Sequence, residues 1–265
     1  MIPTRIVTDE PPYLAVLGEL QPDVVVSTRA EGSVVVLDGA DGWVTRMHAA
    51  AASGARAVVV FEPQGVGEPD HQALGGPGIA VVLDRRWLRP DVAADASAAR
   101  AGDTVRAVIV ECAGLAAENQ ALVRDGVGWA RVLAGGRLRV TSVGSTGAAT
   151  IVLLEGPDAL PVTLSFSTLP SAGAGGLVRV SALGETRTEV TVDGVAGCTE
   201  IQTATRGGVA TAAQRFESAQ RLALRRAMAA IASEGRSSPA DLAEYSADAA
   251  VTAEILSAVA RGRDR

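Results

Sequence analysis

The sequence predicts an α/β domain with a parallel sheet, followed by an α+β domain with a large open antiparallel sheet and C-terminal helices. Short valine-rich runs around one helix-like segment indicate the first domain. A series of strand-like runs at hairpin spacing indicates the second, and two stretches of helical periodicity indicate its end. We place the domains at residues 1–84 and 85–265.

Two apolar runs define the first sheet. Pro22–Thr28 (PDVVVST) and Ala57–Pro63 (AVVVFEP) are nearly continuous in valine, which is typical of strands covered on both faces. Trp43–Gly54 between them predicts a helix that ends at a glycine. We expect further short elements at Arg5–Thr8, Tyr13–Leu20, Ser33–Leu37 and Gly78–Asp84.

The segment in front of Pro22 is short for a nucleotide-binding unit. A complete strand, turn, helix and strand takes about 30 residues or more, and only Met1–Gln21 precede the Pro22 run. No glycine-rich turn of the kind that holds a pyrophosphate occurs there. Gly65-x-Gly67 follows a strand, but Pro69 follows it and no third glycine completes the pattern. The sequence therefore predicts a truncated parallel domain without its phosphate-binding unit.

The second domain begins with a strand at Thr104–Ala113 and a broken helix at Leu115–Leu133. Turn residues then separate six strand-like runs, which predict one antiparallel sheet: Arg137–Val143, Ala149–Glu155, Leu160–Leu169, Gly176–Leu183, Thr186–Val192 and Thr199–Thr205. Helical spacing of apolar residues predicts a helix within Ala210–Ala232. Ser238–Asp241 (SPAD) is typical of the start of a second one.

Composition excludes several classes of function. All 24 basic residues are arginines, so no lysine is present for a Schiff base or a P-loop. Net charge is −6 and the arginines are scattered, which argues against nucleic-acid binding. Cys112 and Cys198 are expected to be buried free thiols, and we expect no metal site. Without a signal peptide or a long apolar segment, we expect a cytoplasmic protein that does not bind membranes.

Three stretches carry a family resemblance: Gly54–Pro63 (GARAVVVFEP), Asp84–Pro90 (DRRWLRP) and Ala130–Val143 (ARVLAGGRLRVTSV). Together with the order of the elements, they resemble the glucose-fructose oxidoreductase / inositol dehydrogenase (Gfo/Idh/MocA) family. The resemblance implies an N-terminal Rossmann domain and a C-terminal open antiparallel sheet. It also implies hydride transfer between a nicotinamide cofactor and a sugar, cyclitol or related small molecule.

The chain departs from this family at three positions that matter for catalysis. The glycine-rich turn is absent. The lysine that the family places between glutamate and proline corresponds to Glu62 in Phe61-Glu62-Pro63. The family's acid/base histidine and the aspartate after it correspond to Asp125 and Gly128, and the only histidines are His48 and His71. We therefore expect a truncated, degenerate member that uses no cofactor.

Two functional hypotheses follow. In the first, the protein is an auxiliary or structural partner in small-molecule metabolism, which pairs through its antiparallel sheet with itself or with a paralogous subunit. In the second, it is a cofactor-independent isomerase, lyase or cyclase of a biosynthetic pathway, with a small-molecule ligand in the former substrate cleft. Glu62 and Asp125 would then act as acid and base, and Arg85, Arg86 and Glu111 are weaker candidates. Against this, both carboxylates could be exposed or paired with arginine. A working NAD(P)-dependent oxidoreductase ranks third.

Overall fold

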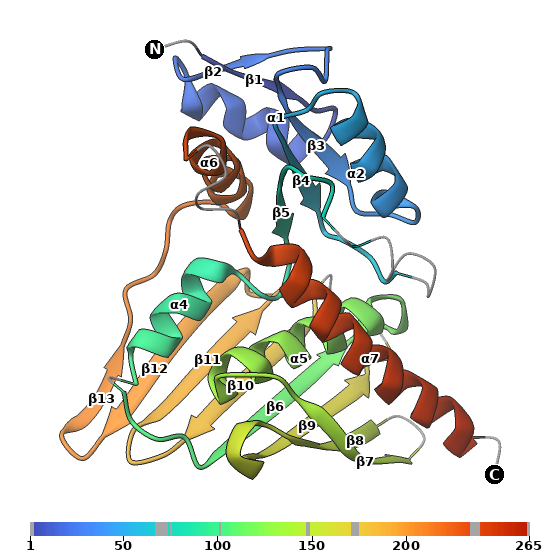
Figure 1. Cartoon of the computed structure of the whole chain (residues 1–265). Helices are drawn as coiled ribbons and strands as arrows, with labels where there is room; N and C mark the ends of the chain where they lie inside the picture. The colour runs from blue at the N-terminus through green and yellow to red at the C-terminus, as the bar shows by residue number, and fades with distance from the viewer. Residues whose placement is uncertain are drawn as a thin grey trace. The chain divides into compact units, whose positions relative to one another are not determined.

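The computed structural model describes residues 3–66, 74, 76–100, 102–146, 149–170, 175–233 and 239–263. Two compact units make up the chain (Figure 1). Unit 1 comprises Met1–Arg86 and Phe216–Ser246, and unit 2 comprises Trp87–Arg215 and Ala247–Arg265. The first unit thus extends to Arg86, two residues beyond the expected boundary at residue 84. Helix α6 (Ala219–Ala232) belongs to unit 1 and not to the second domain.

Unit 1 is built on a five-stranded parallel sheet in the order β2-β1-β3-β4-β5. Its strands are β1 (Thr4–Val7), β2 (Val24–Val26), β3 (Val34–Asp38), β4 (Ala57–Phe61) and β5 (Ala80–Asp84). Helices α1 (Pro11–Leu17) and α6 pack on one face, and α2 (Trp43–Ala52) packs on the other (Figure 1). The valine runs of β3 and β4 are buried on both faces, as the sequence predicts.

The expected loss of the front half of this sheet is wrong. Strand β1, helix α1, the 3₁₀ turn η1 (Gly18–Leu20) and strand β2 form a complete unit between Thr4 and Val26. The unit fits because its helix has only 7 residues and its second strand only 3. A strand–helix–strand unit can therefore be shorter than the usual minimum when its helix has only about two turns and its second strand only three residues.

The last described helix, α7 (Asp241–Arg263), begins in unit 1. The Asp241 carboxylate accepts a hydrogen bond from the backbone N–H of Leu83 (2.8 Å) and both terminal nitrogens of Arg226 (2.6 and 2.9 Å). Strand β5 is the last strand of its sheet, so this carboxylate satisfies an edge N–H that would otherwise be unpaired. Ser238, expected to cap this helix, lies outside the described residues.

Unit 2 contains an eight-stranded sheet in the order β13-β12-β11-β10-β6-β9-β8-β7. All neighbours pair antiparallel except β6 and β9, which are parallel. The strands are β6 (Ala107–Gly114), β7 (Arg139–Thr146), β8 (Ala149–Glu155), β9 (Pro161–Thr168), β10 (Leu177–Leu183), β11 (Arg187–Asp193), β12 (Cys198–Thr205) and β13 (Gly208–Thr211). The expected antiparallel sheet is confirmed apart from the parallel pair and the additional strand β13.

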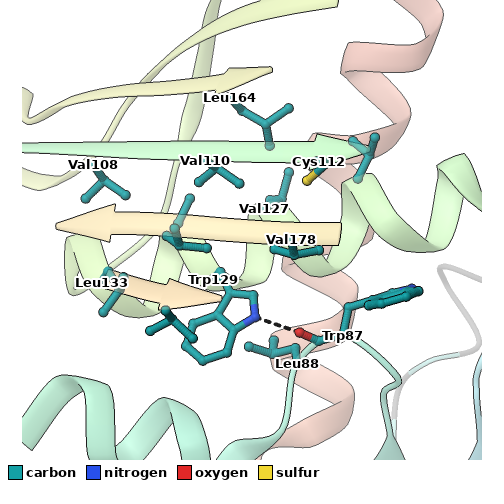
Figure 2. Packing of buried hydrophobic residues seen from close by; sticks show 14 of the residues in the cluster. Trp87, Leu88, Val108, Val110, Cys112, Val127, Trp129, Leu133, Leu164 and Val178 are labelled. Atoms are coloured by element: carbon teal, nitrogen blue, oxygen red, sulfur yellow. Dashed lines mark hydrogen bonds between the residues drawn. The ribbon is translucent and has the colours of Figure 1, made fainter. Parts of the chain in front are cut away.

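Helix α5 (Asn119–Ala134) covers the centre of this sheet and anchors the core (Figure 2). The Trp129 indole N–H donates to the carbonyl of Trp87 at 2.7 Å, which fixes the chain just after β5. Gly126 lets the helix approach closely, since a Cβ there would lie 2.7 Å from the Cys112 Sγ. Helix α4 (Pro90–Ala98), which the sequence did not predict, packs beside α5.

The other face of the eight-stranded sheet presents side chains that alternate with the core residues. Ile109, Ile151 and Leu153 are 40, 56 and 48% exposed there. Register places Leu153 opposite Thr163 and Ile109 opposite Ser181 on this face. We call it the open face. Among the described residues, no helix has an apolar stretch of the length that a bilayer requires.

Candidate functional site

The candidate site lies where the order of the parallel strands reverses. The chain runs outward from β1 to β2 and then crosses to β3 on the other side of β1. Loops leave the carboxyl ends of β1 and β3 in opposite directions, and in sheets of this kind the ligand binds at this switch point. These loops are Thr8–Glu10 and Gly39–Gly42.

Acidic residues occupy this switch point. Asp9 and Glu10 follow β1, and Asp38 ends β3. Burial, together with the negative charges of Asp38 and Asp9, raises the pKa of Glu10 above its usual range. The Glu10 carboxylate is thus close enough to Asp9 and Asp38 to be repelled by both. The sequence contains a signal for this cluster, because the acids lie at or just after the ends of two apolar runs. The sequence does not show that these two runs are neighbours in the sheet.

The helix that follows β1 offers no free N–H at its start. Residues Pro11 and Pro12 have no amide hydrogen. The N–H groups of Tyr13 and Leu14 both donate to the Glu10 carbonyl at 3.0 Å. Every amide in this first turn is therefore either missing or engaged, whereas an anion-binding helix start has several directed at the ligand.

Replacing Glu10 with glutamine should stabilise the protein at neutral pH. The folded-state pKa of Glu10 is raised, so its contribution to stability is intact below the unfolded pKa of about 4.3 and is lost as the pH rises through the folded value. The gain in the free energy of unfolding should therefore be larger at pH 7 than at pH 4, as urea titrations can measure. Glu254→Gln, at an exposed position, is the control; a gain that does not change with pH would contradict the assignment.

Glu62 lies at the end of β4 in a left-handed conformation, with φ of 47°, and is exposed. Its N–H donates to the carbonyl of Asp84 (2.9 Å). Gly39 holds the same segment from the other side: its N–H donates to the Phe61 carbonyl (2.7 Å), and its carbonyl accepts from Gln64 (2.8 Å). Backbone hydrogen bonds thus fix the Phe61-Glu62-Pro63 triplet and leave the Glu62 side chain at the surface.

Buried polar groups connect the end of β5 with two tyrosines. The Tyr13 hydroxyl donates to the Asp84 carboxylate at 2.7 Å. Burial and the Asp84 charge raise the pKa of Tyr13, so the phenol stays protonated and remains a donor. Arg85 is 6% exposed, and its guanidinium carbon lies 5.9 Å from the ring centre of Tyr245. Arg86 is exposed.

Asp125 and Glu111 belong to unit 2, on opposite faces of its sheet. Asp125 is fully buried in α5, accepts a hydrogen bond from the Trp87 backbone N–H (3.1 Å) and pairs with buried Arg124 (3.2 Å). Glu111 lies on the open face, 3.9 Å from Arg179. Glu62, Arg85 and Arg86 belong to unit 1.

The histidines and cysteines of the chain are the remaining candidate side chains. His48 is half-buried in α2, and His71 lies outside the described residues. Cys112 is a buried free thiol as expected, but Cys198 is only half-buried. In the part of the chain that the structure describes, no group of three or more His, Cys, Asp or Glu residues could hold a metal ion.

Neither the models of protein families nor the curated proteins give a match to this sequence. Solved structures do match. A proposed NADPH-dependent oxidoreductase from Desulfitobacterium hafniense has a TM-score of 0.73 and 12% identity, with 99% of this chain and 97% of that chain covered. A dehydrogenase (MviM) from Clostridium difficile gives 0.70 and 10%, with 96% and 98% covered. The chain has the Gfo/Idh/MocA fold.

A third structure with the Gfo/Idh/MocA fold was solved with a cofactor bound. It is a 3-ketoreductase from Actinomadura kijaniata in complex with NADP, with a TM-score of 0.62 and 12% identity, and with 96% of this chain and 97% of that chain covered. At such identities the comparison establishes the fold. In sheets that bind dinucleotides, the turn after the first strand carries the pyrophosphate, and in this chain that turn is Thr8–Glu10.

Proposed function

We propose that this chain is an oxidoreductase-like protein without nicotinamide-dependent hydride transfer, which acts as an auxiliary or structural partner in small-molecule metabolism. One observation carries the proposal: the helix start that would receive the cofactor's pyrophosphate is acidic and begins with two prolines. The fold supplies the oxidoreductase likeness, and the residues of the site supply the argument against hydride transfer.

The residues at the β1–α1 turn do not suit a dinucleotide. A pyrophosphate needs amide hydrogens, glycines for close approach and a positive local potential. This turn provides Asp9 and Glu10, with Asp38 beside them, and its first turn of helix has no unengaged N–H. The pyrophosphate carries two negative charges, so these carboxylates would repel it. A dinucleotide site normally attracts the pyrophosphate instead.

The substrate side gives no support to an acid/base pair. The exposed Glu62 carboxylate has the opposite charge to the lysine that the family resemblance implies at its position. Asp125 is fully buried, and its carboxylate is held by Arg124 and by the Trp87 N–H. A carboxylate held in this way supports the packing of α5, so the isomerase, lyase or cyclase hypothesis has no observation in its favour.

The cofactor claim is tested by calorimetric titration of the pure protein with NAD⁺, NADH, NADP⁺ and NADPH. The 3-ketoreductase from Actinomadura kijaniata serves as positive control, since its structure contains NADP. We expect no saturable heat for this chain at millimolar nucleotide and clear saturation for the control. Micromolar binding of any of the four nucleotides would overturn the proposal.

For the auxiliary role, we propose that the open face binds a second copy of this chain. Ile109, Ile151 and Leu153 form an exposed apolar group, while Arg179 lies 3.9 Å from both Glu111 and Glu189. A face that carries apolar groups and both signs of charge can be complementary to itself across a two-fold axis. A monomer would leave these large aliphatic side chains in water.

Light scattering after size-exclusion chromatography tests this interface. We expect a dimer for the wild type and a folded monomer for the Ile151→Glu/Leu153→Glu variant. Val209→Glu is the matched control, because Val209 is 66% exposed on β13, away from these residues. A monomeric wild type, or a complex formed only with a co-expressed paralogue, would overturn self-association through this face.

A further inference from the structure

A pocket of about 150 Å³ lies entirely within unit 2. Helix α4, the start of strand β12 and the segment after β13 form its walls. The lining includes Arg89, Val92, Asp95, Cys198, Ile201 and Arg215. A cavity of this size holds a ligand of roughly six heavy atoms, about the size of benzene.

Two arginines and two aspartates form an ion-pair network beside this pocket. Arg89 donates to Asp91 through Nε (3.1 Å) and a terminal nitrogen (2.8 Å). Arg215 donates to Asp95 through Nε (2.9 Å) and lies 3.7 Å from Asp91. Burial alone would raise the pKa of Asp91, but the hydrogen bond and charge of Arg89 hold it below its usual range. Asp91 is therefore ionised at neutral pH.

The pocket lining combines side chains of opposite charge with apolar side chains. Arg89 and Asp95 come from the N-cap and the body of helix α4, whereas Arg215 lies 120 residues after Asp95 in the sequence. Val92 and Ile201 are 3 and 6% exposed and contribute apolar surface. With two positive and two negative side chains, the network has no net charge. A bare polyanion would be repelled by the Asp95 carboxylate, and a hydrocarbon would lie against charged side chains that it cannot pair with.

We propose that this pocket binds a small zwitterion of the α-amino acid class. The carboxylate of the ligand binds beside the guanidinium groups of Arg89 and Arg215, and its ammonium group binds beside Asp95. A ligand that carries both charges matches the pocket better than one with a single charge, because each half finds its opposite in the network. The site lies within one unit and does not depend on the proposed function.

The chain contains its own reporter for this pocket. Cys198 lines the pocket and is half-buried, whereas Cys112 is fully buried and burial raises its thiol pKa. Iodoacetamide alkylates a thiolate by displacing iodide, so it should modify Cys198 and spare Cys112. A ligand in the pocket should block this reaction. When the ligand concentration is ten times its dissociation constant, about one pocket in eleven is unoccupied, so alkylation of Cys198 should slow about tenfold.

The experiment measures the rate of Cys198 alkylation by mass spectrometry in the full chain. The probes are serine, alanine and glycine, with lactate and ethanolamine as ligands that carry only one of the two charges. We expect a saturable slowing with at least one amino acid and none with lactate or ethanolamine. Arg215→Gln and Asp95→Asn should each remove the protection, and Arg139→Gln, on β7, should leave it intact.

Three results would overturn the proposal. The first is no protection by any amino acid at about 20 mM, which is about 20 times the dissociation constant of a weak, millimolar site. The second is equal protection by lactate or ethanolamine, and the third is protection that survives both substitutions. Circular dichroism and the alkylation rate without ligand show whether the variants fold as the wild type does. If Arg215→Gln unfolds, Asp95→Asn alone decides the outcome.

Discussion

Alanine at Gly39 should destabilise the protein by about 3 kcal/mol or more. A Cβ at this position would lie 2.4 Å from the Phe61 carbonyl oxygen, 2.5 Å from the Glu62 carbonyl oxygen and 2.5 Å from the Pro63 Cα. All three atoms belong to the backbone at the end of β4, so no side-chain rotation can make room. The sheet must open where β3 and β4 end.

Urea denaturation followed by circular dichroism measures this loss. Gly18→Ala is the matched control in the same unit, because nothing lies within 4 Å of a Cβ there and its φ of −62° suits any residue. We expect the control to stay within about 0.5 kcal/mol of the wild type. A Gly39→Ala protein as stable as the control would mean that the ends of β3 and β4 are not held this close.

Removing the Asp125 carboxylate should cost about 3–5 kcal/mol. Asp125→Ala deprives the Trp87 N–H and the buried Arg124 guanidinium of their shared acceptor. Replacing both partners with leucine should recover most of the loss, since a well-packed apolar pair avoids the cost of burying charge. Thermal and urea unfolding of the single and double variants measure both effects.

Glu111→Ala is the control for this second prediction, because it removes an exposed carboxylate from the opposite face of the same sheet. It should change the free energy of unfolding by less than about 0.5 kcal/mol. An Asp125→Ala protein of unchanged stability would contradict the structural role and would reopen the question of a chemical one.

The strands of the first sheet could be predicted because valine runs such as Val34–Val36 and Val58–Val60 leave few alternatives. The unit in front of them was misjudged on length. Arg5–Thr8 and Tyr13–Leu20 were recognised as a strand and a helix, yet their pairing with Val24–Val26 depends on contacts between segments, which periodicity does not encode. The parallel pairing of β6 and β9 was missed for the same reason.

Weak local patterns account for the other omissions. Helix α4 (PDVAADASA) is rich in alanine and short in large apolar residues, so it shows little amphipathic contrast. Strand β13 has only 4 exposed residues. At the candidate site, Glu62 and Asp125 were identified from a resemblance, but burial and pairing distinguish them: one is at the surface, and the other is enclosed with Arg124. Such differences arise only in the folded chain.

The proline-led start of α1 sets how many changes a phosphate site at this turn would need. Dinucleotide binding there would require amide hydrogens at two proline positions, glycine in a stretch that has none before Gly18, and the removal of the carboxylates beside the turn. No single one of these changes supplies a phosphate site. A variant designed to bind a nucleotide at this turn would therefore have to combine all three kinds of change.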